Sequence, residues 1–182
     1  MQFDHYGGEA ARLAADLVNL TEAPPPHLRP HPHPEDLEPL LAAHGVVHHA
    51  LSTAQAESLR EWSRRLAACF GRQDLDERCD TVNSLLADAS SSPRISLHDG
   101  QPHLHYSASG ADPAAHIRAI TAAGLAHVIC SADAERLGRC ARHGCALAFV
   151  DTSRNGRRTY CSVRCANNDA VARHRERLGR TR

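Results

Sequence analysis

The sequence has no lysine, few aromatic residues and no long hydrophobic segment. All 21 basic residues are arginine, which suits bidentate contact with phosphate groups but would equally follow from a GC-rich genome. The N-terminus does not combine a basic start, an apolar run and a small-residue cleavage site, and no stretch of about 18 apolar residues follows. The sequence therefore predicts neither a signal peptide nor a membrane span, and we expect a cytoplasmic protein.

Sequence signatures of common enzyme classes are also missing. The chain contains no nucleophile elbow, no phosphate-binding glycine loop and no dinucleotide-binding fingerprint. It contains no internal repeat either. We therefore expect a protein that acts by binding and has no enzymatic activity.

The net charge of zero hides a strong asymmetry along the chain. Residues 1–135 carry 9 arginines against 18 acidic residues, whereas residues 136–182 carry 12 arginines against 3. This division predicts an acidic body followed by a basic module that can bind phosphates. A solvated surface, or pairing of the two halves with each other, would give the same composition.

Apolar residues at helical spacing predict five helices in the acidic part. Ser52, with Gln55 three residues later, has the pattern of an N-terminal capping box. The predicted helices cover residues 9–20, 35–44, 53–70 and 75–89, and a fifth extends from Asp112 as far as Leu137. In the fourth helix the predicted core-facing residues are Leu75, Cys79, Val82 and Leu86.

A β-hairpin is predicted over residues 94–107. Apolar and polar residues alternate on both sides of Asp99 and Gly100, a pair typical of tight turns. Six of the ten prolines lie in residues 24–34, which we expect to form a loop between the first two helices. The predicted fold class is mainly α (α+β): an α-helical N-terminal domain with one β-hairpin over 1–135, and a small C-terminal module over 136–182.

Four of the seven cysteines lie close together in the basic module. Cys140 and Cys145 have four residues between them, Cys161 and Cys165 have three, and fifteen residues separate the pairs. In a reducing cytoplasm this pattern favours a structural zinc site, because four thiolates complete a tetrahedral shell. A disulfide pair and an iron–sulfur cluster are the alternatives. Zinc would stabilise a module that has few apolar residues of its own.

The segment between the two cysteine pairs predicts a second hairpin. Its strands would be residues 146–150 and 158–160, joined by a turn at Asn155 and Gly156. Ser162 can then cap a helix that contains Cys165 in its first turn and continues to about Leu178. A cysteine knuckle, a hairpin and a ligand-bearing helix follow one another in the order of a treble-clef zinc finger.

The same residues resemble the CGNR zinc finger of bacterial proteins. That pattern has a cysteine pair, an F-x-D-x-S-R-N turn, a W/Y-C-S step and C-G-N-R before a basic helix. The run LAFVDTSRNGRRTYCSVRCANN follows it from Phe149 through Ser162. The name-giving motif is Cys165, Ala166, Asn167 and Asn168, so the usual glycine and arginine are replaced.

The N-terminal helix is similar to the opening helix of the ABATE domain, which usually precedes this finger. The stretch LAADLVNL has Asp16, Val18 and Asn19 at the places of the pattern L-D-x-V-N-T. The family is regarded as stress-responsive transcription regulators. The resemblance implies a DNA-binding finger attached to a sensing or dimerising domain.

These observations lead to candidate binding residues. The predicted partner is duplex DNA, held mostly by electrostatic contacts with phosphates, with one or two arginines reading bases. Asn19, in a mostly apolar helix, could anchor a small-molecule effector or could be a satisfied buried polar group. The predicted phosphate-binding residues are Arg154, Arg157, Arg158, Arg164, Arg173, Arg175 and Arg177.

A different class of function is also compatible with the sequence. The finger could be a structural or protein-interaction module that docks on the acidic half, in a small-molecule-binding or homodimeric protein. This alternative predicts finger arginines occupied by carboxylates, whereas a free basic surface favours DNA.

The remaining histidines and cysteines allow weaker hypotheses. His98, His103 and His105 could bind a metal on one hairpin face, although solvated strand residues give the same pattern. His143 could replace a thiolate in the metal shell, and His174 could contact phosphate or lie on the surface. Three further cysteines are predicted to be small buried hydrophobic residues, with redox sensing as the alternative: Cys69, Cys79 and Cys130.

Overall fold

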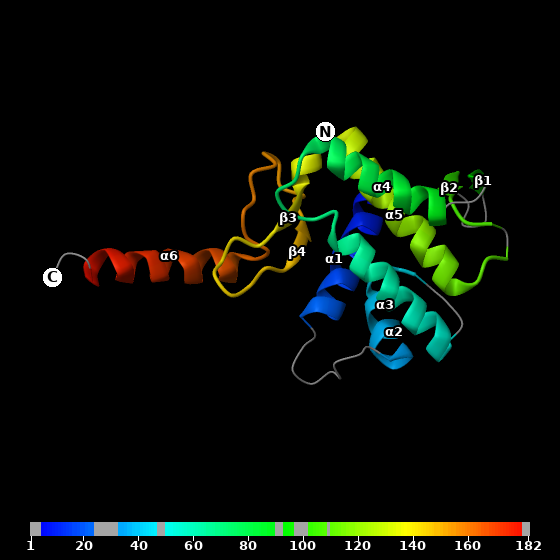
Figure 1. Ribbon diagram of the computed structural model, residues 1–182, viewed down its shortest axis with the longest axis horizontal. Coiled ribbons are helices and arrows are strands. Elements are labelled where there is room, and N and C mark those ends of the chain that lie inside the picture. Colours follow the sequence, from blue (N-terminus) through cyan, green and yellow to red (C-terminus); the bar gives the residue numbers. More distant parts are fainter. Residues whose placement is uncertain are drawn as a thin grey trace.

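The computed structural model describes residues 5–23, 33–46, 50–89, 93–96, 102–108 and 110–179. Their fold is mainly helical, with two small antiparallel sheets (Figure 1), so the predicted fold class is confirmed. The elements in chain order are α1 (His5–Glu22), α2 (Pro34–Ala43), α3 (Thr53–Ala67), α4 (Leu75–Ala89), β1 (Arg94–Ser96), β2 (His103–His105), α5 (Pro113–Ser131), the 3-10 helix η1 (Ala134–Arg136), β3 (Leu137–Arg139), β4 (Ala148–Val150) and α6 (Val163–Gly179).

Helices α1, α3, α4 and α5 enclose the core. The closest packing is between α1 and α5, where Gly124 of α5 faces Ala10 and Ala11 of α1. A Cβ atom at Gly124 would lie 2.6 Å from the backbone nitrogen of Ala11 and 2.7 Å from the Cβ of Ala10. The two helices can approach this closely only because position 124 has no side chain.

Helix α5 is long and apolar enough to cross a membrane by length and composition. Half of the segment is buried inside the protein, however, including Ile117, Leu125 and Val128. Its apolar residues therefore fill the centre of the helical core.

The end of α5 differs from the sequence prediction. Asp112 caps the helix as expected, accepting hydrogen bonds from the next turn, but the helix ends at Ser131 and does not reach Leu137. Ala132 leaves the helical conformation and Asp133 caps η1. Leu137 is fully buried as the first residue of β3. Its apolar side chain falls at helical spacing after α5, so the sequence pattern could not distinguish a longer helix from a new strand.

Helix α4 turns to the core a face that only partly matches the predicted one: Val82 is buried and Leu86 packs partly buried against the core, as expected. Its buried residues are Arg78, Val82 and Leu85, whereas Leu75 is 55% exposed. The Arg78 guanidinium donates hydrogen bonds to the carbonyls of Cys69, Gly71, Ala134 and Leu137 at 3.2, 2.6, 2.7 and 3.1 Å. These acceptors make burial of an arginine possible, and the desolvation lowers the pKa of Arg78.

Both small sheets are antiparallel hairpins, and one was predicted correctly. Strand β1 pairs with β2, with Ile95 opposite Leu104. The second predicted hairpin was wrong in its partner, because β4 pairs with β3 and residues 158–160 form no strand. Gly138 of β3 lies opposite Phe149 of β4, where a Cβ atom would be 2.6 Å from the ring.

Candidate metal centre and basic surface

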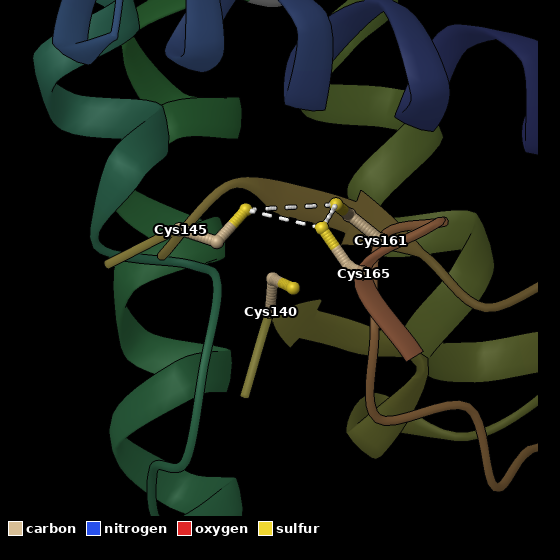
Figure 2. Close-up of side chains that lie close together, drawn as sticks. All are labelled: Cys140, Cys145, Cys161 and Cys165. Atoms are coloured by element: carbon tan, nitrogen blue, oxygen red, sulfur yellow. Dashed lines mark hydrogen bonds between the residues drawn. The ribbon is translucent and has the colours of Figure 1, made fainter. Parts of the chain in front are cut away.

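Four cysteine sulfurs converge at the base of α6, from the two sequence pairs that the spacing predicts (Figure 2). The sulfurs of Cys145, Cys161 and Cys165 are 3.5 to 3.7 Å apart. All four sulfurs, including that of Cys140, lie within 4.8 Å of one another. The structure thus brings both pairs to one point.

This arrangement is compatible with zinc. With Zn–S bonds of about 2.3 Å, the sulfurs of a tetrahedral site are separated by about 3.8 Å. Three of the sulfurs already have nearly this spacing. A closed shell of four thiolates holds the ion without an open coordination position, as in structural zinc sites.

Local backbone contacts position the ligands. The Cys140 amide donates to the carbonyl of Leu147 at 2.9 Å, directly after the β3–β4 pairing. The Ala141 amide donates to the carbonyl of Thr159 at 2.8 Å, which joins the two cysteine pairs. The Ser162 hydroxyl accepts the Cys165 amide at 3.2 Å, so the predicted N-terminal cap of α6 also orients a ligand.

The thiol groups have contrasting acidities. A hydrogen bond from Ser162 lowers the pKa of Cys165 to about 7, whereas burial raises the pKa of Cys161 to about 12. The Arg142 guanidinium lies beside Cys165 and Cys145, and their negative charge raises its pKa. A metal ion would displace the remaining protons, and Arg142 would then offset part of the charge of the thiolates.

The loop between β4 and Cys161 is organised by Asp151. Its buried carboxylate accepts the amides of Ser153 and Arg158 at 2.8 and 2.7 Å. Burial opposes ionisation, but the hydrogen bonds from Ser153 and Arg158, with the charge of Arg136, lower the pKa of Asp151. This turn around a carboxylate explains why residues 158–160 do not return as a strand beside β4.

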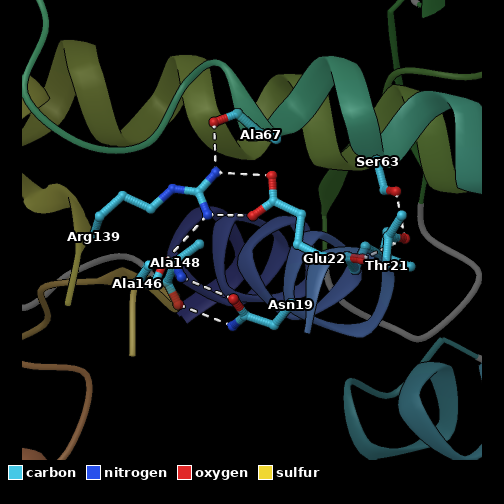
Figure 3. Close-up of polar contacts among 9 residues, drawn as sticks. Asn19, Thr21, Glu22, Ser63, Ala67, Arg139, Ala146 and Ala148 are labelled. Carbon is cyan, nitrogen blue, oxygen red and sulfur yellow. Dashed lines mark hydrogen bonds and ion pairs between the residues drawn. The ribbon is translucent and has the colours of Figure 1, made fainter. Parts of the chain in front are cut away.

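Polar contacts of Asn19 and Arg139 help attach the finger to the helical body (Figure 3). The amide side chain of Asn19 donates to the Ala148 carbonyl at 2.9 Å and accepts the Ala148 amide at 2.8 Å. Arg139 forms an ion pair with Glu22 and donates to the carbonyl of Ala67 at 3.0 Å. Both polar ends of Asn19, considered above as a ligand anchor, are thus engaged with β4.

The seven candidate arginines lie on the outer loop and on α6, and all are exposed. Arg158 and Arg173 make internal contacts. Arg158 donates to the carbonyls of Tyr160 and Cys161, with its guanidinium over the Phe149 ring. Arg173 pairs with Asp169 at 2.9 Å.

Four of the seven make no side-chain hydrogen bond or ion pair within the described residues. They are Arg154, Arg157, Arg164 and Arg175. Arg139 and Arg142 lie on either side of Cys140 and were not among the predicted site residues. Arg139 bonds the finger to the body, and Arg142 lies beside the sulfurs of Cys145 and Cys165. In the sequence, only their positions one and two residues from the predicted metal ligand Cys140 could have indicated a role for them.

The weaker hypotheses have mixed outcomes. His98 and the side chain of His103 lie outside the described residues, and His143 is exposed and not part of the four-sulfur cluster. Cys69 is buried as predicted, and desolvation raises its pKa to about 12, which disfavours a reactive thiolate. Cys130 was predicted to be buried but is exposed.

Family comparisons agree with this geometry. Residues 136–178 match the family described as "CGNR zinc finger", and residues 11–142 match ABATE, described as "Putative stress-induced transcription regulator". A search of curated proteins finds no match. Because the second match spans well over half of the chain, the protein belongs to the ABATE family, with a CGNR zinc finger at its C-terminal end.

Proposed function

We propose that the protein is a cytoplasmic, DNA-binding transcription regulator without enzymatic activity. In this proposal residues 136–182 form the DNA-binding finger, and residues 1–135 sense a ligand or partner or form a homodimer. The observation that carries the proposal is the position of α6. This arginine-rich helix starts at the zinc site and extends away from the body (Figure 1).

The charge distribution on the finger supports this function. Arg154, Arg157, Arg164 and Arg175 are exposed, and within the described residues no carboxylate neutralises them. Four acidic residues of the body pair with arginines of the body, as in Glu57 with Arg60. A basic surface that is not neutralised from within attracts nucleic-acid phosphates.

A second candidate function also has an observation in its favour. Asn19 and Glu22 of α1 hold β4 and Arg139, so the finger is a structural part of the body. This favours a zinc module that stabilises a small-molecule-binding or dimerising protein. Arg139 of the finger does face a body carboxylate, Glu22, as this alternative predicts. Within the described residues, however, no carboxylate faces the exposed Arg154, Arg157, Arg164 and Arg175, and Arg173 pairs with its own helix neighbour Asp169.

A salt titration of duplex binding tests the DNA proposal. If about six of the arginines contact phosphates, the logarithm of the binding constant should fall with that of the salt concentration with a slope of about −5. Replacing Arg173 and Arg177 by glutamine should make the slope less steep by about two. Arg60 and Arg64 lie on α3 of the body, and their replacement is the matched control.

The expected control result is unchanged binding. Absence of duplex binding at low salt, or a slope unaffected by the Arg173 and Arg177 changes, would contradict the proposal.

A further inference from the structure

The arginines of α6 occupy two opposite edges of the helix. With 100° between successive residues, Arg164 and Arg175 fall along one edge, and Arg173 and Arg177 lie roughly 180° away. All four side chains are exposed. The arginines therefore border two faces of α6, which differ in composition.

One of these faces continues from the metal site. It contains the buried Cys165 and the half-buried Asp169, which accepts a hydrogen bond from the Tyr160 hydroxyl at 2.8 Å. By the same helical spacing it also contains Glu176. Both acidic residues of α6 are thus on the face that turns toward the finger.

The opposite face, which we call the reading face, carries no carboxylate and no arginine. Its residues fall within an arc of roughly 100° and are all exposed: Val163, Asn167, Ala170, Val171, His174 and Leu178. Val163, Val171 and Leu178 are 77%, 50% and 58% exposed. Exposed aliphatic side chains of this kind, in line on one helix, indicate a contact surface.

We propose that the reading face of α6 enters the major groove of duplex DNA. Asn167, Val171 and His174 would contact base edges, while the arginines on the two edges contact phosphates of the two strands. This inference rests on the proposed DNA binding. It adds which face of α6 contacts the DNA and which residues recognise the base sequence.

The dimensions and charges of α6 fit this groove. An α-helix with its side chains is about 10–12 Å wide and the major groove is about 12 Å wide. A helix lying in it has one phosphate backbone on each side, which favours cations on both edges of the helix. A single-stranded nucleic acid or an acidic peptide would need only one such edge. Figure 1 shows that the body does not cover α6.

The reading face also has suitable chemistry. An asparagine amide can make two hydrogen bonds with adenine, and an aliphatic side chain can contact the methyl group of thymine. Histidine can donate to or accept from a base edge. Asn167, Val171 and His174 follow one another along the face, so they would contact neighbouring base pairs.

Selection of bound duplexes from a randomised library tests the inference with the zinc-loaded full-length protein. We expect an enriched sequence. Asn167→Ala and His174→Ala should each reduce discrimination at one or two base pairs by at least about fivefold, while binding to an unrelated duplex changes little. Arg164→Gln and Arg175→Gln should instead weaken binding to all sequences alike, and each should lower the salt slope by about one.

The matched control is Asn168→Ala. Asn168 is also exposed and is the residue directly after Asn167, but it lies beyond the arginine edge and should not contact bases. The Asn168→Ala variant should prefer the same DNA sequence as the wild type. Zinc content and helical circular dichroism, measured for every variant, identify any loss of folding.

The possible outcomes separate this inference from the proposed function. Lack of any duplex binding would contradict both. Binding without a preferred sequence, or a preference unchanged in Asn167→Ala and His174→Ala, would overturn the inference alone. If Val171→Ser and Leu178→Ser convert a dimer into a monomer without altering sequence preference, the reading face is a contact between copies and the inference is wrong.

Discussion

At the scale of single residues, the main result is the structural use of polar side chains inside the protein. Asn19 is bonded through both ends of its amide to β4, and Arg78 links the end of α3 to η1 and β3. The sequence identified Asn19 as unusual in an apolar helix. It did not identify Arg78, since only the tertiary structure supplies the carbonyl groups that make its burial favourable.

Arg78 provides the clearest stability prediction. Arg78→Met keeps much of the side-chain volume but removes the donor to the carbonyls of Cys69 and Gly71, at about 1–3 kcal/mol each. The carbonyls of Ala134 and Leu137 each keep a backbone donor. We expect the free energy of unfolding of the zinc-loaded protein to fall by about 3–5 kcal/mol in urea titrations.

The matched control is Arg64→Met. Arg64 is half-exposed and pairs with Glu61 within α3, so the loss should be below about 0.5 kcal/mol. Equal stability of the two variants would show that the carbonyl contacts of Arg78 contribute nothing.

At the scale of elements, a charged cluster around His44 joins α2 to α1, in addition to the apolar packing of Leu37 and Leu41. His44, the C-terminal cap of α2, lies between Asp16 and Glu9 of α1 at 2.9 and 2.8 Å. The hydrogen bond with Asp16 raises the pKa of His44; burial opposes this, and Glu9 adds to the increase. Asp16 and Asn19 are three residues apart on α1, and they hold α2 and β4 respectively.

The raised pKa of His44 predicts a pH-dependent stability. A group whose pKa is higher in the folded than in the unfolded state stabilises the folded state. For His44 this stabilisation is complete at pH values below its unfolded-state pKa, near 6.5, and it is lost as the pH rises through its folded-state pKa. Because Asp16 is about half-exposed, we expect the contribution to be only about 1 kcal/mol. Thermal unfolding from pH 6 to pH 9 should therefore show the wild type losing its advantage over His44→Ala.

A Glu9→Gln, Asp16→Asn double variant is the control for this titration. Neutral amides do not favour the charged imidazole. Adding His44→Ala to the double variant should therefore change the stability by the same amount at pH 6 and at pH 9. If His44→Ala has the same pH-dependent effect in the double variant as in the wild type, Glu9 and Asp16 do not cause it.

At the scale of the whole molecule, the finger and the helical body share one core. Leu137 of β3 and Ala148 and Val150 of β4 are buried together with residues of α1, α3 and α5. The rest of the finger, including α6, has little apolar packing of its own. The metal site therefore stabilises the outer part of the finger, and the shared core holds its inner strands.

This division predicts the effect of removing the metal. Purified protein should contain about one zinc per chain, and a Cys161→Ala, Cys165→Ala double variant should contain none. We expect limited proteolysis to cleave residues 151–179 of that variant while α1 to α5 stay protected, because the helical core does not depend on zinc. A full zinc complement in the double variant would contradict the assigned ligands.

Local spacing and side-chain chemistry were enough to predict the helical class, the caps at Ser52 and Asp112 and the convergence of four cysteines. They did not predict the end of α5, the partner of β4 or the burial of Arg78 and exposure of Leu75 on α4. Those depend on contacts distant in the chain: Asp151 closes a loop, Arg78 finds carbonyls on three other segments, and Asn19 meets β4. Residue spacing along α6 puts its arginines on two edges of the helix. Which of the two faces between these edges turns toward the metal site, and which stays exposed, depends on how the finger folds around the four cysteines.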